Sequence, residues 1–192
     1  MYYMNSLAQA KTLGGIGSIL ILLSIIPYAG IVLFIVGFIL VLMAVKYISE
    51  AAEDKTIFNN MLIAVILAIV GMIAEAAFVV ARLFPFFREF MPMYGPSMFV
   101  EPRMYPFFTT LIIALVILWV FYIGSAIFLR KSYSTIASKL NISMFDTVAL
   151  LYLIGAVLSI VLVGFIVIYV AEILQTVAFF SIVEKEQQPS QA

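Results

Sequence analysis

Two long apolar runs dominate the hydrophobic pattern of this chain, and each is too long for one membrane-spanning helix. Residues 13–45 carry no charge, and residues 147–183 carry only Glu172. A straight helix over the first run would be about 50 Å long at about 1.5 Å per residue, whereas a bilayer core of about 30 Å is crossed by about 20 residues. Residues 27–30 (PYAG) are turn formers in the middle of that run. The pattern predicts a helical hairpin that crosses, turns and returns.

The second run is predicted to break near Val163 and Gly164. Because a glycine is tolerated inside membrane helices, an alternative with five spans stays open, in which the end of the run lies along the interface or projects from it. The predicted fold class is all-α, a polytopic transmembrane helical bundle that forms one domain over residues 1–183. Its six spans are expected at about residues 6–26, 31–48, 57–81, 107–129, 147–162 and 165–183.

Three segments outside the spans have distinct compositions. Residues 82–106 hold five of the seven prolines and are rich in Phe, Tyr and Met. They are predicted to form one long outer loop, irregular because of the prolines and folded against the lipid headgroups, which aromatic rings favour, or over the helix ends. Residues 130–146 are polar and basic, which predicts a short surface helix or loop. The polar tail, residues 184–192, is predicted to be disordered.

Basic residues are unevenly divided between the two sides of this arrangement. Seven of the ten Lys and Arg residues fall on the side that holds both termini, and three, namely Arg82, Arg88 and Arg103, fall on the other. Cytoplasmic loops carry an excess of Lys and Arg, so both termini are predicted to be cytoplasmic and the protein to cross the cell membrane several times. The five-span alternative moves only Lys185 across, so charge does not separate the two arrangements.

Composition supports a lipid environment and excludes several kinds of chemistry. The chain of 192 residues is 66% hydrophobic and 10% charged, against about 25% charged in soluble domains, and its mean hydropathy is +1.22. The lipid bilayer is therefore the expected partner, and the net charge of zero gives no reason to expect nucleic acid. The absence of Cys and His excludes disulfides, thiolate metal sites and imidazole-based catalysis. No cofactor and no enzymatic activity are expected.

The two ends of the chain resemble each other. Residues 13–20 (LGGIGSIL) align with residues 151–158 (LYLIGAVL), and residues 37–50 align with residues 171–184 after a gap of four near the turn. Membrane helices draw on few residue types, so chance similarity is the competing explanation. If the repeat is real, it favours six spans, because the second apolar run would then form a helical hairpin like the first.

Several motifs resemble a known family. They are residues 11–17 (KTLGGIG), 47–50 (YISE), 54–60 (DKTIFNN), 154–158 (IGAVL) and 178–182 (AFFSI). Together they are similar to domain of unknown function 996, an uncharacterised and mainly archaeal family of integral membrane proteins. The resemblance covers most of the chain except the Met- and Pro-rich loop. It implies an archaeal cell membrane and assigns no activity and no catalytic or binding residue.

Two glutamates, Glu172 and Glu75, fall at membrane depth and, with Gln175, are the candidate ion- or proton-binding residues. Glu172 lies near mid-bilayer if the second run breaks at Gly164, and an acid there costs about 2.5–3.5 kcal/mol on insertion scales. It is expected to face other helices, and Gln175, three residues on, is a candidate hydrogen-bond partner. Glu75 lies in the outer third of its span, with Arg82 seven residues on. The alternative for both acids is a purely structural, hydrogen-bonded role.

Other candidate residues favour packing over chemistry. Thioethers suit Cu(I), but they also fill apolar surfaces, so a metal site is not predicted from the methionines of the loop, which are Met91, Met93, Met98 and Met104. Small residues spaced four apart let helices approach closely, within the chain or in a homo-oligomer. The two such pairs are Gly14 with Ser18 and Gly155 with Ser159.

The sequence is compatible with two classes of function. The few buried polar groups and the missing catalytic residues favour a membrane scaffold or assembly component without catalysis. The alternative is a small transporter or channel that works as an oligomer and uses an intramembrane carboxylate.

Overall fold

The computed structural model describes residues 2–90, 104–161 and 163–183, and the regular structure within them is helical. The elements, in chain order, are α1 (Tyr2–Leu22), the short 3₁₀ helix η1 (Leu23–Ile25), α2 (Gly30–Ala51), α3 (Lys55–Phe90), α4 (Met104–Leu140), α5 (Met144–Leu158), the 3₁₀ helix η3 (Ser159–Val161) and α6 (Val163–Phe180). Each of these six α-helices contains a stretch long and apolar enough to cross a membrane. The all-α prediction is confirmed, with six such helices.

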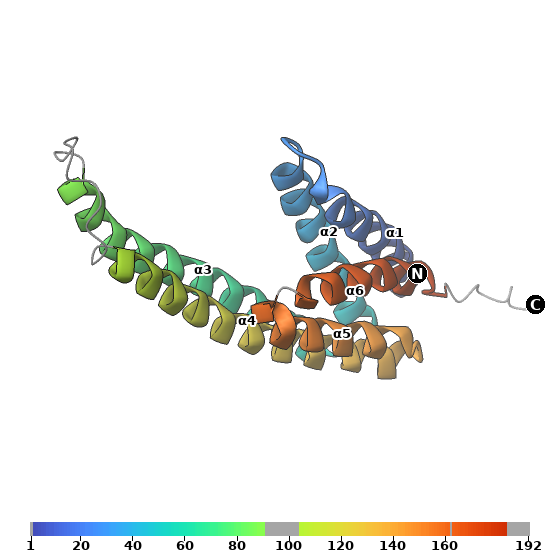
Figure 1. The fold of residues 1–192 in the computed structure, drawn as a ribbon. Helices are drawn as coiled ribbons and strands as arrows, with labels where there is room; N and C mark the ends of the chain where they lie inside the picture. The colour runs from blue at the N-terminus through green and yellow to red at the C-terminus, as the bar shows by residue number, and fades with distance from the viewer. Residues whose placement is uncertain (1, 91–103, 162, 184–192) are drawn as a thin grey trace, which may run out of the picture.

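Consecutive helices pair into three antiparallel hairpins, α1 with α2, α3 with α4, and α5 with α6 (Figure 1). The α1–α2 and α3–α4 hairpins point in different directions, and the shorter α5–α6 hairpin lies between them (Figure 1). Helix α5 packs along α4, and α6 packs along α1. The third hairpin therefore joins the other two.

The helices converge at the end where α1 begins and α6 ends (Figure 1), and a cluster of buried apolar residues lies there. Two edge-to-face aromatic contacts lie in the core there, Tyr133 with Phe145 at 5.7 Å and Phe145 with Phe179 at 5.2 Å between ring centroids. Such contacts contribute about 0.5–1.5 kcal/mol each beyond the area they bury. The same core contains buried aliphatic side chains from the neighbouring helices, among them Val45, Ile48, Ile57, Ile136 and Ile182.

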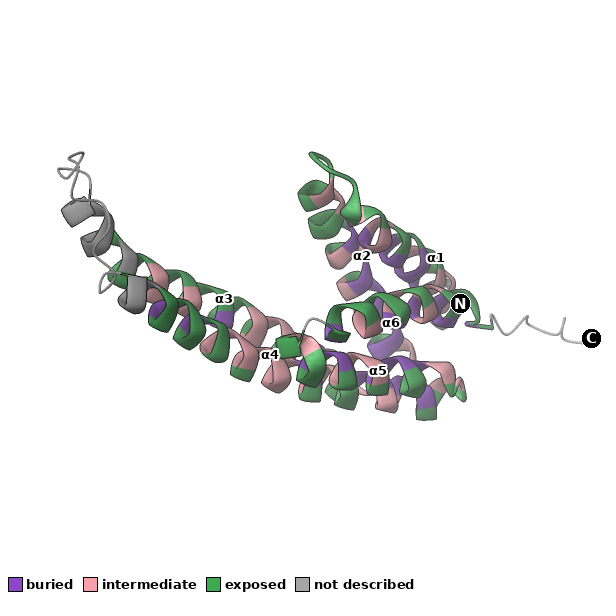
Figure 2. Ribbon diagram, viewed as in Figure 1, coloured by how far each residue is buried: buried purple, intermediate pink, exposed green. Residues whose placement is uncertain are grey.

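The opposite ends of the helices separate, and the α3–α4 hairpin extends farthest without a covering helix (Figure 2). Only 11% of the residues in the most apolar stretch of α3 and of α4 are buried, against 28–33% in the other four helices. Most residues in these two apolar stretches are therefore partly or fully exposed.

The prediction of an irregular loop over residues 82–106 is wrong at both ends. Helix α3 continues to Phe90 and includes Pro85, and α4 begins at Met104 and includes Pro106. Pro106 lies in the first turn of α4, where backbone N–H groups have no intrahelical acceptor, so a proline costs no hydrogen bond. The middle of the predicted loop, residues 91–103, and the predicted disordered tail, residues 184–192, lie outside the described residues.

The predicted separate segment over residues 130–146 is also wrong, because α4 runs without a break to Leu140. Its polar end has one buried face, formed by Ser132, Tyr133 and Ile136, at the spacing of one helical stripe. Packing of that face keeps the segment helical. Asn141 then ends the helix in the left-handed conformation with φ 57°, a common role for Asn.

The boundary between the last two helices differs slightly from the predicted one. Helix α5 ends at Leu158, η3 follows, and α6 begins at Val163. The break therefore precedes Gly164 by a few residues. Gly164 lies inside α6, where a Cβ would come within 2.2 Å of the Gly155 carbonyl oxygen and of the Ser159 nitrogen. The glycine serves the close approach of α5 and α6 and does not itself form the turn.

Candidate functional site

Gln175 is the centre of a buried hydrogen-bond network that joins four helices. Its side chain on α6 is 3% exposed. Its Oε1 accepts hydrogen bonds from the hydroxyls of Tyr133 on α4 at 2.9 Å and Tyr152 on α5 at 3.0 Å, and its Nε2 donates to Ser18 Oγ on α1 at 2.9 Å. We call Ser18, Tyr133, Tyr152 and Gln175 the Gln175 hub. Buried amides need such partners, and this one has three.

Ser18 fixes the direction of the hydrogen bonds in the hub. It is completely buried, and its hydroxyl donates to the carbonyl of Gly14 at 2.8 Å, one turn earlier on α1. A serine hydroxyl has a single proton, so Ser18 accepts the bond from Gln175 Nε2. The amide oxygen of Gln175 therefore faces the two tyrosines, and both tyrosines donate to it.

Small residues bring α1 and α6 close enough for this contact. A Cβ on Gly14 would lie 2.1 Å from the ring of Phe179, and one on Gly15 would lie 2.4 Å from the ring of Phe180. In the α5–α6 hairpin, a Cβ on Gly155 would lie 2.6 Å from the Ile168 side chain. Gly14 and Gly155, two of the predicted packing residues, thus lie at tight helix contacts.

The four predicted packing residues do not all act in the same way. Ser18 forms part of the Gln175 hub. Ser159 opens η3, and its hydroxyl donates to the carbonyl of Ala156 at 2.8 Å, within its own turn. The second pair therefore combines a helix contact at Gly155 with a local hydrogen bond at the end of α5.

Glu172 lies one turn before Gln175 on α6 and is half-buried. Among the described residues, the expected hydrogen bond between Glu172 and Gln175 is not found; the Gln175 amide is bonded to Ser18 and the two tyrosines instead. Glu172 thus lies beside the hub without belonging to it.

Glu75 is half-buried on α3, in the long hairpin with α4. Arg82 places its guanidinium over the ring of Phe78, 5.8 Å from the centroid. Helix α3 packs against α4 and α2, whereas α6 packs against α5 and α1. The two candidate acids therefore lie on helices that are not packing neighbours. Of the loop methionines, Met91, Met93 and Met98 lie outside the described residues, and Met104 begins the backbone of α4.

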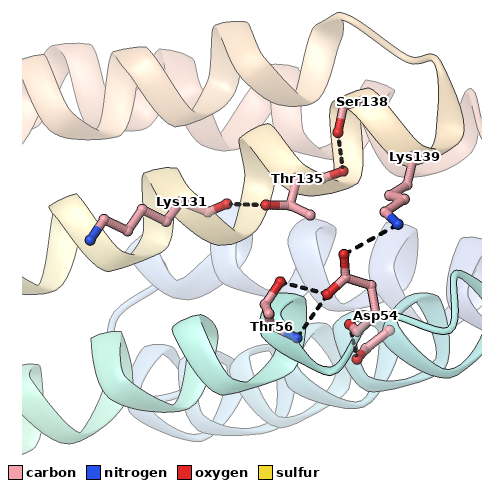
Figure 3. A network of polar contacts seen from close by, with 7 residues as sticks. Asp54, Thr56, Lys131, Thr135, Ser138 and Lys139 are labelled. Carbon is pink, nitrogen blue, oxygen red and sulfur yellow. Dashed lines mark hydrogen bonds and ion pairs between the residues drawn. The ribbon is translucent and has the colours of Figure 1, made fainter.

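A second polar cluster lies at the connection between α2 and α3 (Figure 3). Asp54 caps α3: its Oδ1 accepts from the backbone N–H of Thr56 at 3.0 Å and from the Thr56 hydroxyl at 2.6 Å. Lys139, at the end of α4, forms an ion pair of 3.3 Å with Asp54 Oδ2. The bonds from Thr56, followed by the nearby Lys139 ammonium, hold the pKa of Asp54 below its ordinary value.

The tyrosines of this region were not predicted from the sequence. Tyr152 precedes Gly155 by three residues and Ser159 by seven, so all three lie on one face of a helix, and that face was already predicted to pack. A polar side chain on a packed apolar face was the available signal. Tyr133 gave no comparable signal, because it stands in a segment that was predicted to lie on the surface.

Comparison with known proteins identifies the family. The sequence profile of the family described as "Protein of unknown function (DUF996)" matches residues 33–173. An uncharacterized protein of Methanocaldococcus jannaschii, MJ1644, is 34% identical over 178 residues, which are 92% of this chain and 93% of that protein. The chain therefore belongs to the DUF996 family, as its motifs indicated. No solved structure matches the chain.

Proposed function

We propose that this protein is a multi-pass protein of the archaeal cell membrane that serves as a scaffold or assembly component and has no catalytic activity. A membrane location is supported by large apolar side chains that are exposed on all three hairpins. Examples are Ile31 at 77%, Ile112 at 62% and Ile166 at 67% exposure. Lipid is the solvent in which such surfaces are stable.

Both termini are proposed to be cytoplasmic. In support, the N-terminus, the α2–α3 connection, the α4–α5 connection and the end of α6 all lie at the same end of the molecule (Figure 1). Lys46, Lys55 and Lys139 lie near these connections, and an excess of Lys and Arg is typical of the cytoplasmic side.

Single cysteines in this cysteine-free chain test the orientation. Tyr28 lies in the turn between α1 and α2, and Ser143 lies between α4 and α5; both are exposed. With an impermeant maleimide, Tyr28→Cys is expected to react in intact cells and Ser143→Cys only in inverted vesicles. The reverse pattern would contradict the proposed orientation.

The observation that carries the scaffold role is the Gln175 hub. It joins α1, α4, α5 and α6 through hydrogen bonds among their own side chains, which favours one fixed arrangement of the helices. The α3–α4 hairpin extends away from these hydrogen-bonded helices, with apolar faces that the other described residues leave exposed. A rigid group of four helices with an exposed apolar hairpin beside it is suited to binding other membrane proteins and holding them in place.

A deletion strain and proteoliposomes test this role together. Deletion is expected to lower the amount of one assembled membrane complex on native gels, and the wild-type gene is expected to restore it. The reconstituted protein is expected to give no flux of protons, metal ions or small solutes above that of empty vesicles. Flux in liposomes, with native gels unchanged by deletion, would overturn the scaffold role.

One observation favours the second candidate, a small oligomeric transporter. Glu172 places a half-buried carboxyl in the apolar helix α6, one turn before Gln175, and intramembrane acids are typical of ion pathways. For a transporter, flux should be present in proteoliposomes and should fall in Glu172→Gln while Glu75→Gln retains it.

A further inference from the structure

Two arginines lie at the two ends of an apolar stretch of the α3–α4 hairpin. The helices are antiparallel, and Gly71 of α3 lies against Phe121 of α4, where a Cβ on the glycine would come within 2.5 Å of the phenylalanine Cβ. In this register, Arg82 of α3 lies about 20 residues along α4 from Arg130, or about 30 Å at about 1.5 Å per residue. A bilayer core is also about 30 Å thick. The hairpin therefore gives a scale of depth in the membrane, from Arg130 on the cytoplasmic side to Arg82 on the outer side.

The α5–α6 hairpin ends partway along this scale. Helix α5 packs along α4, and the indole N–H of Trp119 donates to the carbonyl of Val157 at 3.2 Å, in the last turn of α5. Trp119 lies 11 residues from Arg130, or about 16 Å. The chain then continues through η3 to Val161 and returns as α6.

The length of η3 limits how much farther the hairpin can reach. From Val157 to the end of η3 the chain rises by at most about 8 Å. Even if this segment continued straight along α4, the turn would lie about 24 Å from the level of Arg130, short of the level of Arg82. Figure 1 shows α3 and α4 continuing well past the end of the α5–α6 hairpin. On the depth scale, the turn therefore falls inside the hydrocarbon.

The end of α5 has the hydrogen bonds that such a position requires. The last carbonyls of a helix have no donor within the helix, and an unsatisfied backbone group is costly in hydrocarbon, where water cannot serve it. Here Trp119 donates to Val157, and the Ser159 hydroxyl donates to the carbonyl of Ala156 at 2.8 Å. Side chains of the protein thus satisfy two carbonyls that water would satisfy at a membrane surface.

The side chains around the turn are also suited to hydrocarbon. Residues 147–171 carry no charge, and Val161 and Val163, on either side of the turn, are 58% and 53% exposed. The connection at the opposite end of α5 differs, because it contains the exposed polar residues Asn141 and Ser143. The two ends of this helix therefore match two different solvents.

We propose that α5 and α6 form a re-entrant hairpin, which enters the membrane from the cytoplasmic side, turns within the hydrocarbon and returns to the same side. Helix α4 supports the turn through Trp119, and the hydrocarbon chains of outer-leaflet lipids cover its exposed apolar side chains. The chain then crosses the membrane four times, with α1 to α4, and both termini stay on one side. The inference rests on the membrane location proposed above and does not depend on the scaffold role.

Spin labels at single cysteines measure the depth of the turn. In proteoliposomes of the full chain, collisions of the label with oxygen and with a water-soluble nickel chelate are compared for Val161→Cys and Phe108→Cys. Phe108 of α4 is 51% exposed and lies 22 residues from Arg130, or about 33 Å, at the outer surface. The label at Val161 is expected to lie deeper, with a higher ratio of oxygen to nickel collisions. A label at Val161 as shallow as that at Phe108 would overturn the proposal.

A third label separates this proposal from the membrane location itself. Val116 of α4 is 42% exposed and lies 14 residues from Arg130, or about 21 Å, so Val116→Cys is expected to collide mainly with oxygen. Mainly nickel collisions there would contradict the membrane location. If Val116 lies in hydrocarbon and Val161 does not, only the re-entrant hairpin is wrong. Val163→Cys replaces Val161→Cys if that variant does not fold.

The single tryptophan gives the same reading without any substitution. Trp119 is bonded to the end of α5, so its depth is close to that of the turn. Lipids that carry a nitroxide near the middle of the acyl chain are expected to quench its fluorescence more than lipids that carry it near the headgroup. Stronger quenching by the headgroup-proximal nitroxide would place the turn at the membrane surface and overturn the proposal.

Discussion

The hydroxyl of Tyr133 on α4 donates a 2.9 Å hydrogen bond to the side-chain oxygen of Gln175 on α6, 42 residues later in the chain. Tyr133 is 1% exposed and also packs edge-to-face on Phe145. The bond thus links the apolar core at the converging helix ends to the polar hub beside Glu172. The polar hub and the apolar core of the converging helices are therefore connected through Tyr133.

Replacing Gln175 by Leu is expected to lower the free energy of unfolding by about 1–3 kcal/mol. The change leaves the hydroxyls of Tyr133 and Tyr152 without their acceptor in a buried site, although hydrogen bonds between membrane helices average nearer 0.6 kcal/mol each. Unfolding in mixed micelles, followed by the fluorescence of the single tryptophan, Trp119, measures the difference. Thr176→Val, which loses only a bond within α6, is the control, and equal effects of the two changes would contradict the role of the hub.

Two glycine substitutions are expected to have opposite effects. A Cβ at Gly164 would lie 2.2 Å from backbone atoms of Gly155 and Ser159, which cannot rotate away, whereas a Cβ at Gly124 meets only Leu67 at 3.7 Å. Gly164→Ala should therefore destabilise by about 1–3 kcal/mol, and Gly124→Ala should be neutral or stabilise by up to about 1 kcal/mol. Thermal unfolding of both variants in the same detergent checks this. A Gly164→Ala variant as stable as the wild type would show that α5 and α6 are farther apart.

Asp54 is expected to make the stability depend on pH at acidic values. The bonds from Thr56, and then Lys139, hold its pKa below the ordinary value, so the folded state binds this proton less readily than the unfolded state. The contribution is present above about pH 4, the ordinary carboxyl pKa, and is lost as the pH falls through the lowered pKa. In Asp54→Asn, this part of the decline in melting temperature at low pH should disappear.

The exposed acid Glu50 provides the control for that measurement. It forms a 3.9 Å pair with Lys46, with both side chains about half exposed, and surface pairs of this kind contribute little. Glu50→Gln should keep the acid-dependent decline of the wild type. If Asp54→Asn and Glu50→Gln have identical pH profiles, the cap of α3 is not the source of the decline.

Trp119 is expected to hold the end of α5 in place. Its indole N–H donates to the carbonyl of Val157 at 3.2 Å, within the last turn of the helix, where carbonyls lose their intrahelical partners. Loss of this bond in Trp119→Phe should cost about 1 kcal/mol, so that amides of residues 158–161 exchange about fivefold faster. Hydrogen exchange with mass spectrometry measures the change. An effect spread evenly over α4 and α5 would argue against a local role.

The sequence predicted the helices better than their ends. Runs of apolar residues identify segments that must avoid water, and the turn at residues 27–30 and the break before Val163 separate them. The predictions were wrong where polarity was used as the signal for irregular structure. Residues 130–140 are polar, yet they stay helical because Tyr133 and Ile136 pack on other helices. Pro106 was read as a helix breaker, but it lies in a first turn, where proline fits.

The candidate site was predicted only in part. The sequence singled out Glu172 and Gln175 because polar side chains are conspicuous in apolar segments, and Ser18 because it is a small residue four positions after Gly14. It paired Gln175 with Glu172 on the basis of their spacing on one helix, whereas the structure pairs Gln175 with Ser18, Tyr133 and Tyr152 from three other helices. Contacts between residues far apart in the chain depend on how the hairpins pack, which spacing along one helix does not report.

By itself, the sequence determined that this protein consists of apolar helices in hairpins, since that follows from which side chains must leave water and from the lengths of the runs. Only the tertiary structure decided which helices are neighbours and which polar groups meet. The reason is physical: apolar surfaces attract one another without direction, so a pattern of them allows many packings. The close approach at Gly14 and Gly164 and the directional bonds of Gln175 select one.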